Sequence, residues 1–253
     1  MINDFIDKLN IEKGSVLLLT ENSLTFLVTM KKMDKTFNFN IFIDKLIEKL
    51  GEEGTLLIQT FDWRFCSGKK FDILNSKSQT SFLGNTALKR DDFIRTKHPI
   101  YSFAVTGKYK DKLANLNNIG AFDKDSPFAF IYTKKAKMMI IDIPLQNSFT
   151  FVHHVEDIEQ VSYRYNKSFT SKYIDDKGIE NNKTYDMYVR DIENNVVTYF
   201  KPLEKLLIDN NAMDIYTVKE LVIRDIDLHK AYHIIEDDIR NNNAKSLYKI
   251  GES

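Results

Sequence analysis

Cysteine is nearly absent from this sequence, since Cys66 is the only one in 253 residues. One thiol excludes an intramolecular disulfide bond and a zinc site built from thiolates. Glycine is also scarce, and none of the nine glycines forms a Walker loop or a dinucleotide-binding fingerprint. The Gly-x-Ser-x-Gly elbow of many serine hydrolases is missing as well. The sequence therefore gives no support to a Walker-type nucleotide-binding enzyme, a dinucleotide-binding enzyme or a serine hydrolase of this type.

Net charge is lacking too, because 36 basic residues balance 36 acidic ones. A neutral chain has no overall field that attracts nucleic acid or an anionic membrane, so we expect neither as a partner. The first residues lack the basic start and apolar centre of a signal peptide, and the apolar runs are too short to span a bilayer. We therefore expect a soluble cytoplasmic protein.

Apolar runs of strand length are present, and two of them frame a helical pattern. Residues 14–19 and 54–60 read as buried strands. Residues 38–50 between them have helical spacing and end at Gly51, a suitable helix stop. Strand, helix and strand at this spacing predict a βαβ unit, with a parallel strand pair inside an α/β layer structure.

The rest of the chain shows two kinds of sequence pattern. Long polar connections over 61–81 and 95–102 adjoin predicted strands, and ligands often bind at such loops in α/β proteins. From residue 161 onward, alternating segments rich in Tyr, Phe, Val and Thr predict antiparallel strands. We expect one compact unit over 1–253, with an α/β part over 1–160 and a β-rich part plus terminal helix over 161–253. Further strands are expected at 103–105, 136–143, 161–165, 169–174, 183–190, 196–200 and 213–226, and helices at 2–9, 82–89, 111–118, 202–210 and 227–247.

Two adjacent histidines stand out in the segment 147–156 (NSFTFVHHVE). If Thr150 caps a helix here, His153 and Glu156 are three residues apart and share a face. A carboxylate in that position holds the imidazole ring and fixes its tautomer, as a general base requires. His154 would point about 100° away, so the two histidines have different roles. The alternative is a helix that carries two incidental histidines.

A second histidine pair lies in the terminal helix. His229 and His233 are four residues apart, a spacing that can hold a metal ion. No third ligand is visible nearby in the sequence, which favours a solvated helix face. We therefore expect no metal site.

The candidate groups suit a reaction in which one proton leaves a nucleophile that the enzyme does not itself supply. Acyl transfer from a thioester to an amine is such a reaction, because a neutral imidazole can accept the proton of the attacking amine. Positioning of the two substrates would supply much of the remaining acceleration. The residues permit acyl transfer without selecting it.

Five segments together resemble the aminoglycoside 3-N-acetyltransferase family in order and spacing. The Arg-x-x-His-Pro-x-x-Ser and Thr-x-x-His-x-x-Glu motifs among them are specific in combination. The resemblance implies an acyltransferase with a three-layer α/β/α sandwich around a mixed sheet and with antiparallel strands in the C-terminal third. It also implies acetyl-CoA or another acyl-CoA as donor and an amine on a sugar-like ring as acceptor. We expect no metal, and a homodimer is one assembly that we consider. The segments are 54–63 (GTLLIQTFDW), 78–83 (SQTSFL), 95–103 (RTKHPIYSF), 126–128 (SPF) and 149–156 (FTFVHHVE).

The resemblance assigns roles by position. His153 matches the catalytic base, and Glu156 matches the residue that orients it. A second group of residues is expected to contact the substrate, and a third to contact CoA. The substrate-binding residues are His98, Ser102, Thr150, Asp62 and Trp63, and the cofactor-binding residues are Ser78, Gln79, Thr80 and Arg95.

Three positions depart from the family pattern. Ser81 stands where the family usually has Gly, so the backbone there is expected to differ. The segment 20–23 (TENS) replaces the typical His-Ser-Ser, and 142–144 (DIP) replaces a small turn that contains Gly. The His153/Glu156 pair is untouched by these changes.

The charge balance bears on the acceptor. A polycationic aminoglycoside calls for an acidic cleft, whereas this neutral chain has basic residues near the expected site. We therefore expect a nucleotide-linked amino sugar, whose phosphates those residues would bind. An aminoglycoside acceptor, or an inactive relative that only binds CoA, remains the alternative. The basic residues are Lys69, Lys70, Arg90, Arg95 and Lys97.

Overall fold

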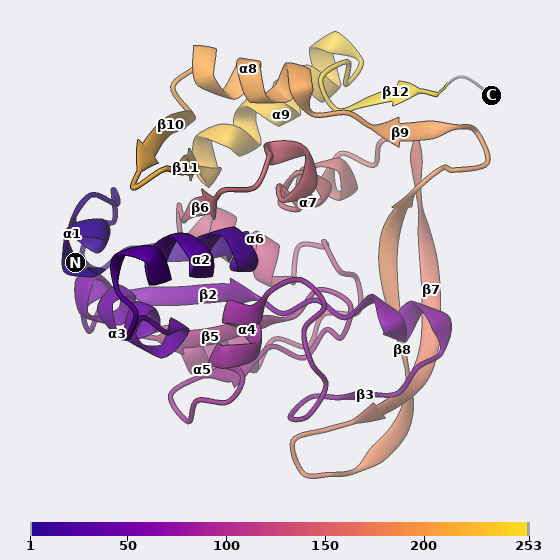
Figure 1. Cartoon of the computed structure of the whole chain (residues 1–253). Coiled ribbons are helices and arrows are strands. Elements are labelled where there is room, and N and C mark those ends of the chain that lie inside the picture. Colours follow the sequence, from indigo (N-terminus) through magenta and orange to yellow (C-terminus); the bar gives the residue numbers. More distant parts are fainter. Residues whose placement is uncertain (1, 252–253) are drawn as a thin grey trace.

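A mixed seven-stranded sheet forms the centre of the protein, in a computed structural model that describes residues 2–251 (Figure 1). The strand order is β10-β11-β6-β1-β2-β5-β4. Strand β1 is parallel to both β2 and β6, while the other neighbours in the sheet pair antiparallel. The strands are β10 (Met213–Val218), β11 (Leu221–Asp227), β6 (Lys137–Ile141), β1 (Val16–Glu21), β2 (Thr55–Gln59), β5 (Phe103–Gly107) and β4 (Ile94–Arg95).

Helices cover both faces of this sheet, because successive side chains of a strand point to opposite faces. On β1, Leu17 and Leu19 join one buried cluster, whereas Val16 and Leu18 join another. The first cluster lies under α1 (Ile2–Asp7), α2 (Ser23–Met33), α3 (Phe39–Leu50) and α4 (Phe82–Ala87). The second lies under α5 (Lys110–Ala114), α6 (Pro127–Thr133), α7 (Val152–Ile158), α8 (Lys201–Asp209) and α9 (Leu228–Asn242). The expected three-layer α/β/α sandwich is confirmed.

The predicted βαβ unit is present, with one addition. Asn38 caps α3 by accepting a hydrogen bond from the Ile41 backbone, and Gly51 ends the helix at a φ of 67°. The crossover also contains α2, a helix that was not predicted from the sequence. That helix begins at the N-cap Asn22 and buries a narrow stripe that includes Phe26 and Met30. Such a narrow stripe gives a weak helical pattern.

Antiparallel pairs dominate the C-terminal third, as expected, and form a long hairpin and two shorter pairs. The strands predicted at 161–165 and 169–174 are a single strand, β7 (Arg164–Ile174), which pairs along its length with β8 (Glu180–Arg190). The hairpin stands beside the main sheet (Figure 1) and also pairs with β3 (Phe71–Asp72). The strand predicted at 213–226 is the hairpin of β10 and β11, and β9 (Val196–Thr198) pairs with β12 (Tyr248–Ile250).

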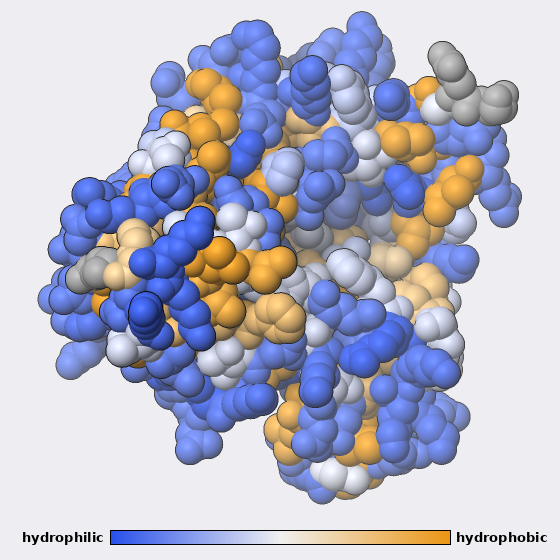
Figure 2. Space-filling model, in the orientation of Figure 1, coloured by the Kyte–Doolittle hydropathy of each residue, from blue (hydrophilic) through white to orange (hydrophobic). Residues whose placement is uncertain are grey.

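The face of the molecule seen in Figure 2 is mainly polar. Figure 2 shows hydrophilic residues over most of one face, with hydrophobic residues in separate patches. None of the helices within residues 2–251 is long and apolar enough to cross a membrane. The division expected at residue 160 stays a prediction, and β11 beyond it pairs directly with β6 before it.

Candidate active site

Helix α7 carries the histidine pair, and it begins later than predicted. Its N-cap is Phe151, and no side chain caps the helix. The expectation that Thr150 is the N-cap is therefore wrong. Thr150 lies in the preceding turn, where its carbonyl accepts a hydrogen bond from the His153 backbone. Four aromatic and aliphatic residues around the start of α7 are buried in the hydrophobic cluster under α5 to α9. Their packing, instead of a polar cap, fixes this end of the helix.

His153 and Glu156 are in direct contact, as the spacing predicted. Nδ1 of His153 lies 2.6 Å from Oε2 of Glu156, and the ring packs near those of Phe122 and Phe200. The Glu156 side chain is 1% exposed, whereas that of His153 is 17% exposed. If Nδ1 carries the proton that Glu156 accepts, Nε2 has a free lone pair. The carboxylate of Glu156 is therefore closed off from solvent, whereas the imidazole of His153 is partly accessible.

Two further residues hold the Glu156 carboxylate. The Tyr163 hydroxyl donates a hydrogen bond of 2.9 Å to Oε1, and Nε of Arg164 lies 2.6 Å from Oε2. Burial by itself raises the pKa of Glu156, but the positive charge of Arg164 and the contact with His153 outweigh it, so this pKa is lowered. The carboxylate is therefore ionised at neutral pH.

His153 is neutral in the same conditions. Burial lowers its pKa, and the charge of Arg164 lowers it further, while Glu156 opposes both effects in part. A neutral imidazole that is fixed by a carboxylate can accept a proton at Nε2.

His154 has partners other than those of His153, as expected from its position on α7. Its Nδ1 donates a hydrogen bond of 2.6 Å to the carbonyl of Phe122. Burial lowers the pKa of His154. This histidine ties α7 to the segment before α6 and does not meet Glu156.

Three of the expected site residues, Arg95, His98 and Ser102, are buried, and two of them meet at the end of β2. Nε of Arg95 donates to Oγ of Ser102 at 2.9 Å, and the Ser102 hydroxyl donates to the Thr60 carbonyl at 2.8 Å. His98 is 0% exposed, packs against Tyr185, and accepts a hydrogen bond from the Tyr101 backbone at Nδ1. Burial lowers the pKa of His98 to about 4. In this conformation all three side chains meet other parts of the protein, and their expected binding roles stay predictions.

Asp62 and Trp63 differ in exposure although they are adjacent. Asp62 is buried and caps a short 3-10 helix, η1 (Trp63–Ser67), while its carboxylate pairs with Arg64. Trp63 is 44% exposed and touches the buried Phe61 with its edge. Of the two, Trp63 is therefore the one that a ligand can reach in this structure.

The expected cofactor loop lines a cavity of about 390 Å³. Ser78, Gln79 and Thr80 form one wall, and the N-terminal end of α2 forms another. Asn85 fixes this loop, because its side chain accepts from the Ser78 backbone at 2.8 Å and donates to the carbonyls of Ser78 and Ser81. The backbone at Ser81 is extended, and its hydroxyl caps α4.

Glu21 is a buried residue beside this cavity that the sequence analysis did not single out. Its carboxylate accepts hydrogen bonds from the hydroxyls of Ser23 and Ser81 and from the backbone of Leu83. Burial raises the pKa of Glu21 to about 7, although these hydrogen bonds oppose the shift. It lies in the segment 20–23, so its departure from the family pattern was the available signal.

Arg164 and Tyr163 were missed altogether as site residues. They belong to a stretch predicted only as a strand, and no motif links them to Glu156. In the part of the chain that the structure describes, no three possible metal ligands lie together.

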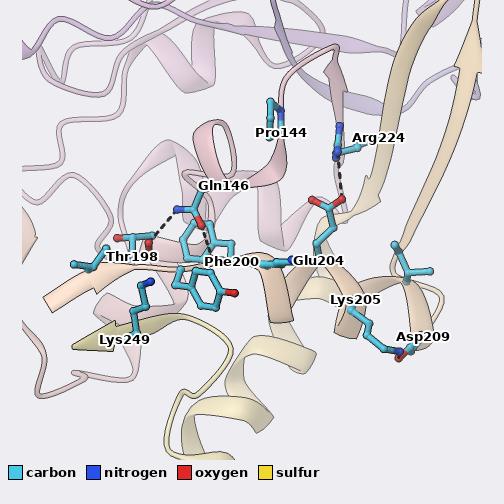
Figure 3. A pocket seen from close by; sticks show the side chains of 13 residues that line it. Pro144, Gln146, Thr198, Phe200, Glu204, Lys205, Asp209, Arg224 and Lys249 are labelled. Atoms are coloured by element: carbon cyan, nitrogen blue, oxygen red, sulfur yellow. Dashed lines mark hydrogen bonds and ion pairs between the residues drawn. The ribbon is translucent and has the colours of Figure 1, made fainter. Parts of the chain in front are cut away.

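Phe200 lines a second cavity, of about 750 Å³ (Figure 3). The centroid of its ring lies 6.2 Å from that of His153. The walls of the cavity come from the segment after β6, from β9, from one side of α8 along its length, and from β11 and β12. Arg224 pairs with Glu204 at 3.2 Å across the cavity wall. The other basic residues that line it are Lys201, Lys205 and Lys249, and the other acidic residue is Asp209.

Comparison with known families identifies the chain. The aminoglycoside 3-N-acetyltransferase family matches residues 29–239. The chain belongs to this family. It is therefore an enzyme, a CoA-dependent N-acetyltransferase that uses acetyl-CoA as donor. Family membership favours an aminoglycoside acceptor over the nucleotide-linked amino sugar that the sequence analysis preferred. A search of curated proteins finds no significant match.

Solved structures share the fold of this acetyltransferase. AAC-IIIb in a binary complex with CoASH has a TM-score of 0.76 at 13% identity, covering 95% of each chain. AAC-VIa bound to sisomicin has a TM-score of 0.76 at 15% identity, covering 95% of this chain and 96% of that one. The YokD protein from Bacillus subtilis has a TM-score of 0.75 at 19% identity, covering 96% of this chain and 93% of that one.

Proposed function

We propose that this enzyme transfers an acetyl group from acetyl-CoA to an amino group of an aminoglycoside, with His153 as general base and Glu156 as the residue that orients it. The observation that carries the proposal is the contact of 2.6 Å between a buried, ionised Glu156 and a partly exposed His153. Family membership supports the choice of donor and acceptor.

The reaction follows from the state of the two side chains. The acceptor amine attacks the thioester carbonyl, and Nε2 of His153 removes a proton from its nitrogen as the N–C bond forms. The tetrahedral intermediate then releases the CoA thiolate as the C–S bond breaks. The imidazolium returns its proton to that thiolate, which regenerates the neutral base. Glu156 stabilises the imidazolium between these steps.

We place the pantetheine arm in the cavity lined by Ser78, Gln79 and Thr80. This cavity has Ile143 in its wall, and the next residue, Pro144, lines the cavity beside Phe200. The two cavities are thus lined by adjacent residues of one segment, and we propose that one holds the donor while the other holds the acceptor. Trp63 and Thr150 are at least partly exposed and remain proposed contacts of the substrate.

A nucleotide-linked amino sugar is the second candidate acceptor, and one observation favours it. Four basic and two acidic residues line the cavity beside Phe200 (Figure 3). Lys249 lies over the Tyr199 ring at 4.9 Å, so the cavity wall combines a cation with an aromatic ring. Phosphates and a base would suit these groups, whereas a polycation would be repelled by the excess positive charge.

The experiment is a steady-state assay of CoA release with acetyl-CoA and two sets of acceptors. One set holds aminoglycosides, and the other holds nucleoside-diphosphate-linked amino sugars. We expect turnover with the aminoglycosides. Turnover with the nucleotide-linked set alone would select the second candidate, and CoA binding without thioester cleavage for any amine would indicate an inactive relative. Lys201→Glu with Lys249→Glu should raise KM only for the anionic set.

A further inference from the structure

Arg164 occupies an unusual position beside the His153/Glu156 pair. It is the first residue of β7 and is buried, with Nε 2.6 Å from the same Glu156 oxygen that His153 contacts. Its Nη1 also donates a hydrogen bond of 3.2 Å to the carbonyl of Tyr188 on β8. The guanidinium is therefore fixed from two sides, and its charge is placed by the β7–β8 hairpin.

The charges of the three buried groups explain why an arginine is needed there. With Arg164 present, an ionised Glu156 and a neutral His153 sum to zero charge. Without it, the same two states would leave one uncompensated negative charge out of contact with water. Burial of an unpaired charge costs free energy, and protonation of the imidazole is the change that would neutralise the pair at the lowest cost. A protonated His153 cannot act as a base.

We propose that Arg164 is a positioning residue that keeps Glu156 ionised and His153 unprotonated at neutral pH, so that the imidazole is available as a base. The proposal rests on the proposed role of His153. It gives the β7–β8 hairpin a part in catalysis, which the residue spacing within α7 does not indicate.

Other charged and titratable groups around the pair are few. On α7 itself, His154 faces away and Asp157 lies near Asp123, from the segment before α6. The hairpin adds Arg190, which is opposite Arg164 in the strand register and also lowers the pKa of His153. The nearby hydroxyl groups belong to Tyr163, Tyr188 and Tyr248, the last stacked on Tyr163. Toward α8, the ring meets the apolar Phe200.

The test is the pH dependence of kcat/KM in the Arg164→Gln variant. Loss of the positive charge should move the acidic limb of the profile to higher pH by about one unit or more. A purely structural role would lower kcat/KM at every pH and leave the limb where it is. An unmoved limb, or a limb moved to lower pH, would overturn the proposal.

Two further variants separate charge from shape. Arg164→Lys keeps the charge and should leave the limb within about half a unit of the wild type, given the different reach of lysine. Arg190→Gln removes an exposed charge and should move the limb in the same direction, but less. If Arg164→Gln does not fold, these two variants still test the proposal. A larger shift of the acidic limb in Arg164→Lys than in Arg190→Gln would contradict it.

A readout without turnover keeps this proposal separate from the proposed function. NMR titration of the His153 ring, assigned with a His153→Asn variant, measures its protonation directly. The midpoint should rise in Arg164→Gln relative to the wild type. A rise with no acetyl transfer to any acceptor would refute the proposed function alone, whereas an unchanged midpoint in an active enzyme would refute the role of Arg164 alone.

Discussion

The hydroxyl of Ser81 lies 2.9 Å from one carboxylate oxygen of Glu21 and 3.0 Å from the other. The same hydroxyl accepts a hydrogen bond from the Gly84 backbone, while Ser23, also bonded to Glu21, accepts one from Phe82. Glu21 accepts the third backbone bond, from Leu83. The first backbone N–H groups of α4 are thus satisfied by one buried carboxylate and its two serines, which joins the end of β1 to the proposed CoA loop.

The buried Glu21 predicts a pH-dependent stability. Its pKa is raised from an ordinary value of 4.5 to about 7, so the folded state binds its proton more tightly than the unfolded state does. The unfolding free energy of the wild type should therefore fall relative to Glu21→Gln as the pH rises through this range, by roughly 3 kcal/mol in total. Urea unfolding at a series of pH values from 5 to about 8 measures it.

A matched control for this prediction is Glu220→Gln, a substitution of an exposed glutamate in the turn between β10 and β11. The difference in unfolding free energy between Glu220→Gln and the wild type should not vary with pH in the way that it does for Glu21→Gln. A Glu21→Gln difference that is constant with pH would show that the carboxyl group titrates alike in the folded and unfolded states.

Asn85 should influence CoA binding without touching the reacting groups. Its side chain makes three hydrogen bonds to the loop of Ser78 and Ser81. Removing them in Asn85→Ala should weaken CoA binding by about tenfold to a hundredfold, because each such bond contributes about 1 kcal/mol and about 1.4 kcal/mol corresponds to tenfold. Isothermal titration with CoA measures the change. The neighbouring Thr86→Ala removes only an exposed bond to the Phe82 carbonyl, and an equal loss in both variants would contradict the prediction.

His153→Ala should reduce kcat by ~10²–10⁴ and leave the Kd for CoA nearly unchanged, because the ring acts on the proton of the amine and not on the donor. Rapid-mixing kinetics and equilibrium binding give the two quantities. His233→Ala is the control, since His233 is an exposed histidine that pairs with Glu236 on α9. Turnover of His153→Ala at the wild-type rate would remove His153 from its proposed role.

Local patterns made part of this site predictable. A three-residue spacing places His153 and Glu156 on one face of any helix, so their contact follows from helical geometry alone. The apolar runs at β1 and β2 likewise predicted a parallel pair, because each is a buried strand and a helix lies between them. The start of α7 was misplaced because packing of Phe151, and not a polar cap, holds that end of the helix.

Contacts across the chain could not be predicted in this way. Glu21 and Ser81 are 60 residues apart, and nothing in either segment specifies that α4 will begin beside the end of β1. Arg164 reads as one more residue of an alternating strand until the hairpin turns its side chain toward Glu156. His98 reads as a loop residue, and only the packing of Tyr185 from that hairpin shows that it is buried.

The sequence by itself determined the layered α/β architecture and the pairing of a histidine with a carboxylate, because both depend on residues within a few turns or strands of each other. The tertiary structure decided the protonation states of that pair and which loop residues remain exposed. Burial and charge depend on which distant segments pack together, and a buried arginine contributed by a separate hairpin changes the state of both groups.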